Sequence, residues 1–155
     1  MSYLVEKKKL RIVLADDNPK WLQLLVSIVE AKFKVVGTAA NGYAALRSIF
    51  HLKPDVAVLD LQMPGRNGLE VTRELMNNVQ KPAVVICSMH RGEEIVEAAR
   101  EAGALGYVFK HDCAQHLLAA LEAAGEGRLS FPPGCAAQAR PTRGSNGRIF
   151  CGIPN

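Results

Sequence analysis

The stretch Val56-Ala57-Val58-Leu59-Asp60 decides the fold class. Its first four residues are apolar in succession, so both faces of an extended segment would be buried, as in the centre of a parallel sheet. Parallel strands need long crossover connections, which are usually helices. The stretch therefore predicts an α/β fold in which Asp60 lies at the carboxyl end of a buried strand.

Short apolar runs alternate with amphipathic stretches on both sides of this segment, which is the βα repeat of an α/β fold. We expect strands at residues 10–15, 35–39, 56–60, 83–87 and 105–109. We expect helices at 19–33, from 42 to a stop at Pro54, and at 69–76, 93–102 and 114–126. The residues expected on the inner helix faces are Trp21, Leu24, Leu25, Ile28 and Val29; Leu46, Ile49 and Phe50; Ile95, Ala98, Ala99 and Ala102; and Ala114, Leu117, Leu118 and Leu121.

Strict alternation of strands and helices with right-handed crossovers predicts an open parallel sheet covered on both faces. We predict a flavodoxin-like, doubly wound (βα)5 domain with strand order 2-1-3-4-5. Its expected bounds are residues 10–127, after a leader at 1–9. Residues 128–155 lack a sustained period and are rich in Gly and Pro, so we expect a mostly unstructured tail in which Phe131 or Ile149-Phe150 docks locally.

Charge is distributed unevenly along the chain. The tail at 128–155 holds four arginines and no acid, whereas residues 1–127 hold 15 basic and 15 acidic residues. We therefore expect no basic nucleic-acid surface on the folded part. No apolar run is long enough for a membrane span or a signal peptide, and the four cysteines show no zinc spacing. A cytoplasmic protein is expected.

Polar residues follow four of the predicted strands where ligand sites of open α/β sheets form, at the carboxyl ends. They are Asp16 and Asp17, Asp60, Ser88 and Lys110. Three carboxylates held together repel one another, and a hard divalent cation such as Mg²⁺ relieves this repulsion. A carboxylate beside Mg²⁺, a lysine and a hydroxyl is suited to phosphoryl transfer, in which the carboxylate is the nucleophile.

The sequence resembles the receiver domains of two-component response regulators over about residues 9–127. The matching pieces are Leu14-Ala15-Asp16-Asp17, Asp60-Leu61-Gln62-Met63-Pro64 with Gly68, Ser88, and Gly106-Tyr107-Val108-Phe109-Lys110. The resemblance implies that Asp60 is the phospho-acceptor. It implies Mg²⁺ binding by Asp17, Asp60 and the Gln62 backbone carbonyl, with Asp16 nearby. It also implies that Lys110 and Ser88 contact the phosphoryl group and that Tyr107 is a switch residue.

Further pieces look most like the subfamily that carries a C-terminal helix-turn-helix. They are Ala40-Asn41-Gly42, Gly103-Ala104, and Gly125-Glu126-Gly127-Arg128. Residues 129–155 show no amphipathic helix pair, so that second domain is expected to be missing, and nucleic-acid binding is not expected.

The expected function is a Mg²⁺-dependent signalling switch that accepts a phosphoryl group from a sensor histidine kinase or phosphotransfer protein, and is not otherwise an enzyme. A homodimer through the face of the fourth and fifth strand–helix units is a further expectation. Two alternatives remain: an interaction module that keeps the fold without phosphorylation, motivated by the bulky Met89 beside Ser88, and a truncated DNA-binding regulator. A phosphatase is disfavoured because Gln62 stands where its general acid is needed.

Overall fold

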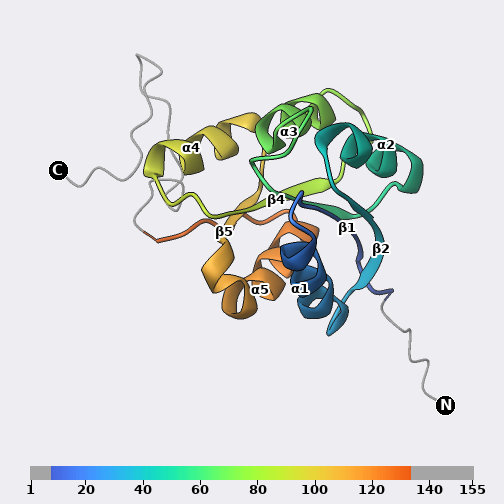
Figure 1. Ribbon diagram of the computed structural model, residues 1–155, viewed down its shortest axis with the longest axis horizontal. Helices are drawn as coiled ribbons and strands as arrows, with labels where there is room; N and C mark the ends of the chain where they lie inside the picture. The colour runs from blue at the N-terminus through green and yellow to red at the C-terminus, as the bar shows by residue number, and fades with distance from the viewer. Residues whose placement is uncertain (1–7, 134–155) are drawn as a thin grey trace.

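The computed structural model describes residues 8–133 as five parallel strands that alternate with helices (Figure 1). The strands are β1 (Arg11–Ala15), β2 (Lys34–Ala39), β3 (Val56–Leu59), β4 (Ala83–Ser88) and β5 (Gly106–Phe109). The helices are α1 (Pro19–Glu30), α2 (Gly42–Leu52), α3 (Gly68–Met76), α4 (Glu93–Ala102) and α5 (Cys113–Gly125), with a 3₁₀ turn at Lys110–Asp112 before α5. The predicted alternation is confirmed.

The sheet has the order β2-β1-β3-β4-β5, and every neighbouring pair is parallel. The predicted flavodoxin-like fold is therefore confirmed. β3 lies in the centre and all four of its residues are buried, as its uninterrupted apolar run indicated. The carboxyl ends of β1 and β3 are neighbours, with Ala15 opposite Leu59, so the residues that follow these two strands come out at one edge.

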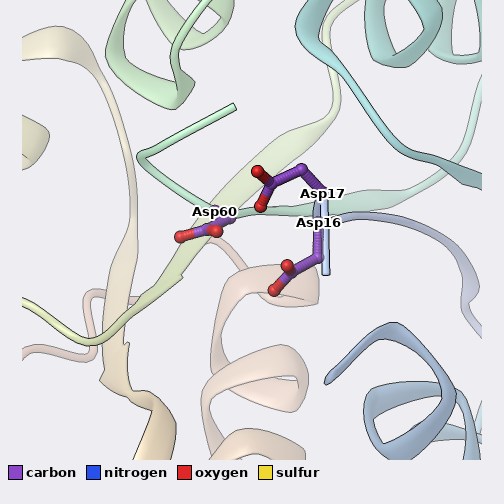
Figure 2. Close-up of side chains that lie close together, drawn as sticks. All are labelled: Asp16, Asp17 and Asp60. Atoms are coloured by element: carbon purple, nitrogen blue, oxygen red, sulfur yellow. The ribbon is translucent and has the colours of Figure 1, made fainter. Parts of the chain in front are cut away.

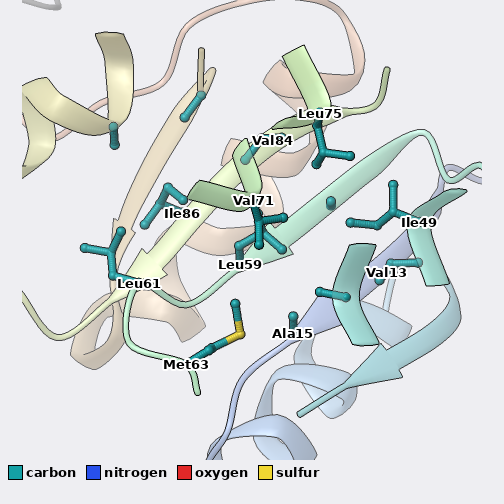
Figure 3. Close-up of a cluster of buried hydrophobic side chains, with 14 of the residues drawn as sticks. Val13, Ala15, Ile49, Leu59, Leu61, Met63, Val71, Leu75, Val84 and Ile86 are labelled. Carbon is teal, nitrogen blue, oxygen red and sulfur yellow. The ribbon is translucent and has the colours of Figure 1, made fainter. Parts of the chain in front are cut away.

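Helices cover both faces of the sheet, with α2, α3 and α4 on one side and α1 and α5 on the other (Figure 1). The apolar cluster under α2–α4 contains Ile49, Val71, Leu75 and Val96 beside strand residues such as Leu59 (Figure 3). The cluster under α1 and α5 is built around Leu25, Val29, Leu117 and Leu121. Two filled layers of core give the sheet a rigid platform for the residues at its carboxyl edge.

Three residues expected on inner helix faces are on the outside instead. Leu24 and Phe50 are 44% and 43% exposed, and Ala114 is also exposed. Each lies at the margin of the apolar arc of its helix, where packing against the sheet rather than residue type decides burial. The first helix also ends at Glu30 rather than near Phe33, because the chain turns there to bury Phe33 against the core.

The first residues of the predicted tail, 128–133, which we call the C-terminal strap, pack against β5, and Phe131 docks as expected. Ser130 forms a parallel bridge with Gly106 of β5, and Phe131 is 7% exposed. A turn at Gly127, with φ of +78°, directs the chain back towards β5. The open edge of β5 offers unpaired backbone N–H and C=O groups to the strap. The hydrophobic periodicity of the sequence does not predict this pairing. Residues 1–7 and 134–155, including Ile149-Phe150, lie outside the described residues.

None of the helices between residues 8 and 133 combines the length and the apolar character that crossing a bilayer requires.

Candidate functional site

Three carboxylates meet at the carboxyl ends of β1 and β3 (Figure 2). One oxygen from each of Asp16, Asp17 and Asp60 lies within 4.8 Å of the others. Asp16 and Asp60 are buried, whereas Asp17 is exposed. The sequence prediction that these residues converge is therefore met in the geometry, and one side of the cluster is open to solvent.

Lys110 follows β5 and reaches into this cluster. Its Nζ lies 2.7 Å from Asp16 Oδ2 and donates a hydrogen bond to Asp60 Oδ2 at 3.2 Å. The lysine is 4% exposed, so its charge is held in place by the two buried carboxylates. One ammonium thus faces three carboxylates, and the excess negative charge suits a divalent cation.

The pKa values of the buried pair follow from burial and charge. Burial raises the pKa of Asp60, the Lys110 charge opposes that rise, and the Asp16 charge adds to it, with a net increase. Burial lowers the pKa of Lys110, but hydrogen bonding and charge from Asp16 and Asp60 outweigh it, so the net shift is upward. Lys110 is therefore a fixed cation, and the burial of Asp60 makes its charged form depend on nearby positive charge.

The donor set fits a Mg²⁺ ion. Mg²⁺ prefers oxygen ligands and is held by one or two carboxylates together with waters. Asp16 Oδ1 accepts the Asn18 N–H at 2.9 Å, which anchors this side chain, while Asp17 makes the exposed side of the group. Among residues 8–133, these three acids are the group whose side chains could ligate a metal together.

A hollow of about 510 Å³ opens beside the acids. Asp17, Gln62, His90 and Ile95 are among its lining residues. Gln62, whose backbone carbonyl is an expected Mg²⁺ ligand, has an exposed side chain. Met89, whose bulk suggested blocked access, is 49% exposed to solvent on the loop after β4 and is not part of this lining.

Gly68 holds the loop after β3 close to the site. A Cβ at this position would lie 2.3 Å from the Asp60 carbonyl oxygen, which is far inside contact distance. The Gly68 N–H donates to the Leu61 carbonyl at 2.9 Å. Only a glycine can approach the backbone here, so the path of the loop from Asp60 to α3 depends on this residue.

The two expected switch residues are joined through the backbone of His90 and also interact directly, because the Tyr107 hydroxyl lies within hydrogen-bonding reach of the Ser88 side chain. Ser88, at the end of β4, is 1% exposed, and its Oγ accepts the His90 N–H at 3.1 Å. Tyr107 is 2% exposed, and its hydroxyl donates to the His90 carbonyl at 2.8 Å. Burial raises the pKa of Tyr107 to about 12, so the phenol stays a neutral donor.

Sequence reasoning missed two residues of this region. His90 links Ser88 to Tyr107 through its backbone, and no sequence signal marks such a role because any residue has that N–H and C=O. Trp21 was assigned to the core, but its ring also lies under the Lys110 ammonium, 5.3 Å from ring centroid to Nζ. An apolar period predicts that this ring packs in the core, but it does not predict the cation–π contact with the buried Lys110.

The model of the response regulator receiver domain matches residues 12–122. The transcriptional regulatory protein YvfU of Bacillus subtilis (strain 168) is 35% identical over 126 residues, which are 80% of this chain and 63% of that protein. A solved two-component response regulator of the LuxR family from Aurantimonas sp. SI85-9A1 is 34% identical, with a TM-score of 0.77 over 81% of this chain and 91% of that one.

A third relative is named as an enzyme rather than as a transcriptional regulator. Protein-glutamate methylesterase/protein-glutamine glutaminase 4 of Myxococcus xanthus (strain DK1622) is 40% identical over 104 residues, which are 65% of this chain and 30% of that protein. The match to this relative lies in its receiver part, so it does not suggest an esterase here.

The chain spans 59% and 63% of the length of two transcriptional regulatory proteins of Bacillus subtilis that it matches. What the remaining parts of those proteins do is a property of those proteins. Our expectation that this chain does not bind nucleic acid stays a prediction. The family match, the relatives and the shared fold together show that this chain belongs to the response regulator receiver domain family.

Proposed function

We propose that this chain is a phosphorylation-dependent switch in which Asp60 accepts a phosphoryl group from a phosphohistidine. Response regulator receivers interact with histidine kinases or phosphotransfer proteins, and one of these would be the donor. The observation that carries the proposal is the setting of the Asp60 carboxylate, 3.2 Å from the Lys110 ammonium and within 4.8 Å of two further carboxylates.

In the transfer, an Asp60 oxygen attacks phosphorus, an O–P bond forms and the N–P bond to the donor imidazole breaks. The imidazole nitrogen keeps the electron pair of the broken bond and binds a proton. Lys110 is positioned to neutralise a phosphoryl oxygen as charge builds there. Burial of Asp60 and Lys110 strengthens this attraction, because water screens it less than at the surface.

Asp16, Asp17, Asp60 and the Gln62 backbone carbonyl would hold Mg²⁺, which receiver domains bind in general. The ion, when bound, neutralises equatorial phosphoryl oxygens. Asp16 has its own anchor in the Asn18 N–H, so its position does not depend on the ion. The exposed Asp17 leaves a path for the ion and the donor from solvent.

Ser88 and Tyr107 would convert the modification into a change of shape. A phosphoryl group adds a charge of roughly −1.5 to −2 and several strong acceptor oxygens. The Ser88 hydroxyl is the donor expected to turn towards them. Its Oγ now accepts from His90, whose carbonyl accepts from Tyr107, so a move of Ser88 reaches Tyr107 through one residue.

The proposal is tested by incubating the protein with Mg²⁺ and acetyl phosphate and measuring its intact mass. We expect an adduct about 80 Da heavier, the mass of one phosphoryl group. Asp60→Asn should form none. Asp55→Asn is the matched control, since Asp55 precedes the same strand at its opposite, exposed end, and it should form the adduct as wild type does. An adduct retained in Asp60→Asn would contradict the proposal.

A titration with Mg²⁺ and beryllofluoride separates the switch from an interaction module that is never phosphorylated. Trp21 is the single tryptophan of the chain, and its ring lies 5.3 Å from Lys110 Nζ. Its fluorescence should therefore change when ligands draw Lys110 towards them. A silent titration together with no mass adduct would favour the module.

A further inference from the structure

The C-terminal strap, residues 128–133, continues the sheet beyond β5. The Ser130 N–H donates to the Leu105 carbonyl at 2.8 Å, and the Tyr107 N–H donates to the Ser130 carbonyl at 3.0 Å. Both bonds close the free edge of an outer strand of the sheet. The strap therefore takes the hydrogen-bonding groups that β5 would otherwise present to a partner.

Residues of both β5 and the strap fit this pairing. A Cβ at Gly106 would lie 3.1 Å from the Ser130 carbonyl oxygen, so a side chain there would press on the strap. Phe131 is 7% exposed and belongs to the same apolar cluster as Tyr107, Val96 and Ala99. Its ring thus inserts on the α4 side of β5, where Tyr107 also lies. The strap is therefore packed against the domain through both its backbone and the Phe131 ring.

Tyr107 connects this strap to the acidic site in two steps. Its backbone N–H binds Ser130, and its hydroxyl binds the His90 carbonyl at 2.8 Å. The His90 N–H in turn binds Ser88 Oγ at 3.1 Å. Ser88 stands at the end of β4, next to the β3 strand that leads to Asp60. Each link is a single hydrogen bond between buried or partly buried groups.

We propose that the C-terminal strap is an autoinhibitory contact of the switch: a phosphoryl-type ligand at Asp60 loosens the strap, and loosening the strap strengthens binding of that ligand. This inference rests on the proposed function. When Ser88 turns to the ligand, its oxygen leaves the His90 N–H. His90 is then free to shift, and its carbonyl, which accepts from the Tyr107 hydroxyl, shifts with it. The Tyr107 backbone and ring then no longer hold Ser130 and Phe131 in place. Coupling of this kind is reciprocal and amounts to about 5-fold to 150-fold in affinity.

Hydrogen exchange of the full chain tests the first half of the inference. With Mg²⁺ and beryllofluoride, the amides of Ser130 and Tyr107 should exchange at least about fivefold faster. The Lys34 amide, which donates to the Leu10 carbonyl at the other end of the sheet, is the control and should not change. Unchanged exchange at Ser130 and Tyr107, despite a Trp21 response, would overturn the inference while the proposed function stands. No response of either would overturn both.

Two variants test the second half. Phe131→Ala removes the buried ring of the strap without touching the acidic site, and should tighten beryllofluoride binding at least about fivefold. Leu129→Ala is the matched control, because Leu129 is a strap residue that is 45% exposed, and it should bind as wild type does. Equal affinity of Phe131→Ala and wild type would contradict the coupling.

Tyr107→Phe separates coupling from packing, since it keeps the ring and removes only the hydroxyl, which binds the His90 carbonyl and interacts with Ser88. In this variant beryllofluoride should still change Trp21 fluorescence, but it should no longer accelerate exchange at Ser130. Acceleration equal to that of wild type would show that the link does not pass through the Tyr107 hydroxyl, and would overturn it.

Discussion

β1 and β3 carry charged residues at both ends, and the two ends differ in how the charges are held. At the amino ends the Arg11 N–H donates to Asp55 Oδ2 at 2.8 Å, and the Asp55 N–H donates to the Arg11 carbonyl at 2.8 Å. At the carboxyl ends Asp16 and Asp60 share the ammonium of Lys110. Asp55 is exposed, whereas both site acids are buried.

The difference separates charges that solvent can satisfy from charges that only a partner can satisfy. The amino-end groups find backbone partners and water, so they cost little. The carboxyl-end acids are desolvated and outnumber their one lysine, so they are stable only with positive charge nearby. This need for further positive charge makes the carboxyl ends of the strands a cation-binding site, whereas the amino ends are ordinary protein surface.

Removing the cation at each end should break this contrast most clearly. Lys110→Met leaves Asp16 and Asp60 buried without their partner, and should lower the free energy of unfolding by about 3 kcal/mol. Arg11→Met, at the exposed end, removes the hydrogen bond from the guanidinium to the Lys53 carbonyl and should cost about 1 kcal/mol or less. Urea unfolding without Mg²⁺ measures both losses. Equal losses would mean that the buried acids do not depend on Lys110.

Adding a cation should sharpen the same contrast. Mg²⁺ at about 100 times its Kd should raise the free energy of unfolding by about 2.7 kcal/mol, because it binds the folded acidic cluster. Thermal unfolding with and without the ion measures this gain. Asp17→Asn should lose most of it, and Asp55→Asn should keep it. A gain that survives in Asp17→Asn would place the ion elsewhere.

Backbone spacing around the site gives a third, smaller effect. Gly68→Ala would bring a Cβ to 2.3 Å from the Asp60 carbonyl oxygen, so the loop must shift. We expect a loss of about 2 kcal/mol in unfolding free energy, together with slower phosphorylation. Gly92→Ala is the control, because its Cβ would meet nothing within 4 Å. Gly92 is the N-cap of α4, where Ala is less favourable than Gly, so this variant should lose about 1 kcal/mol or less.

The smallest effect concerns the buried phenol that links the site to the strap. Burial raises the pKa of Tyr107 from 10.0 to about 12, so the unfolded chain releases this proton at lower pH than the folded one. The contribution of Tyr107 to stability is thus complete below pH 10 and is lost as pH rises towards 12.

Unfolding free energy should therefore fall by up to about 1.4 kcal/mol per pH unit in this window, relative to Tyr107→Phe. The difference in absorbance between the two proteins reports the phenolate directly. A phenolate that already forms at pH 10 would contradict the burial of this hydroxyl.

The order of the apolar runs along the chain was sufficient to predict the sheet and most of the residues of the site. Val56–Leu59 had to be a central strand because both of its faces are apolar, and the strand-end rule then brought Asp16, Asp60 and Lys110 together. Helix margins were less determined. Leu24 and Phe50 fit the helical period but are exposed, because the sheet covers a narrower arc than the period allows.

Sequence alone determined which chemical groups gather at the acidic edge, since side-chain type and position along a strand are properties of the chain itself. Only the tertiary structure decided that His90 joins Ser88 to Tyr107 and that Ser130 closes the edge of β5. The physical reason is that these links use backbone N–H and C=O groups, which every residue carries and which acquire a partner only when distant segments are brought side by side.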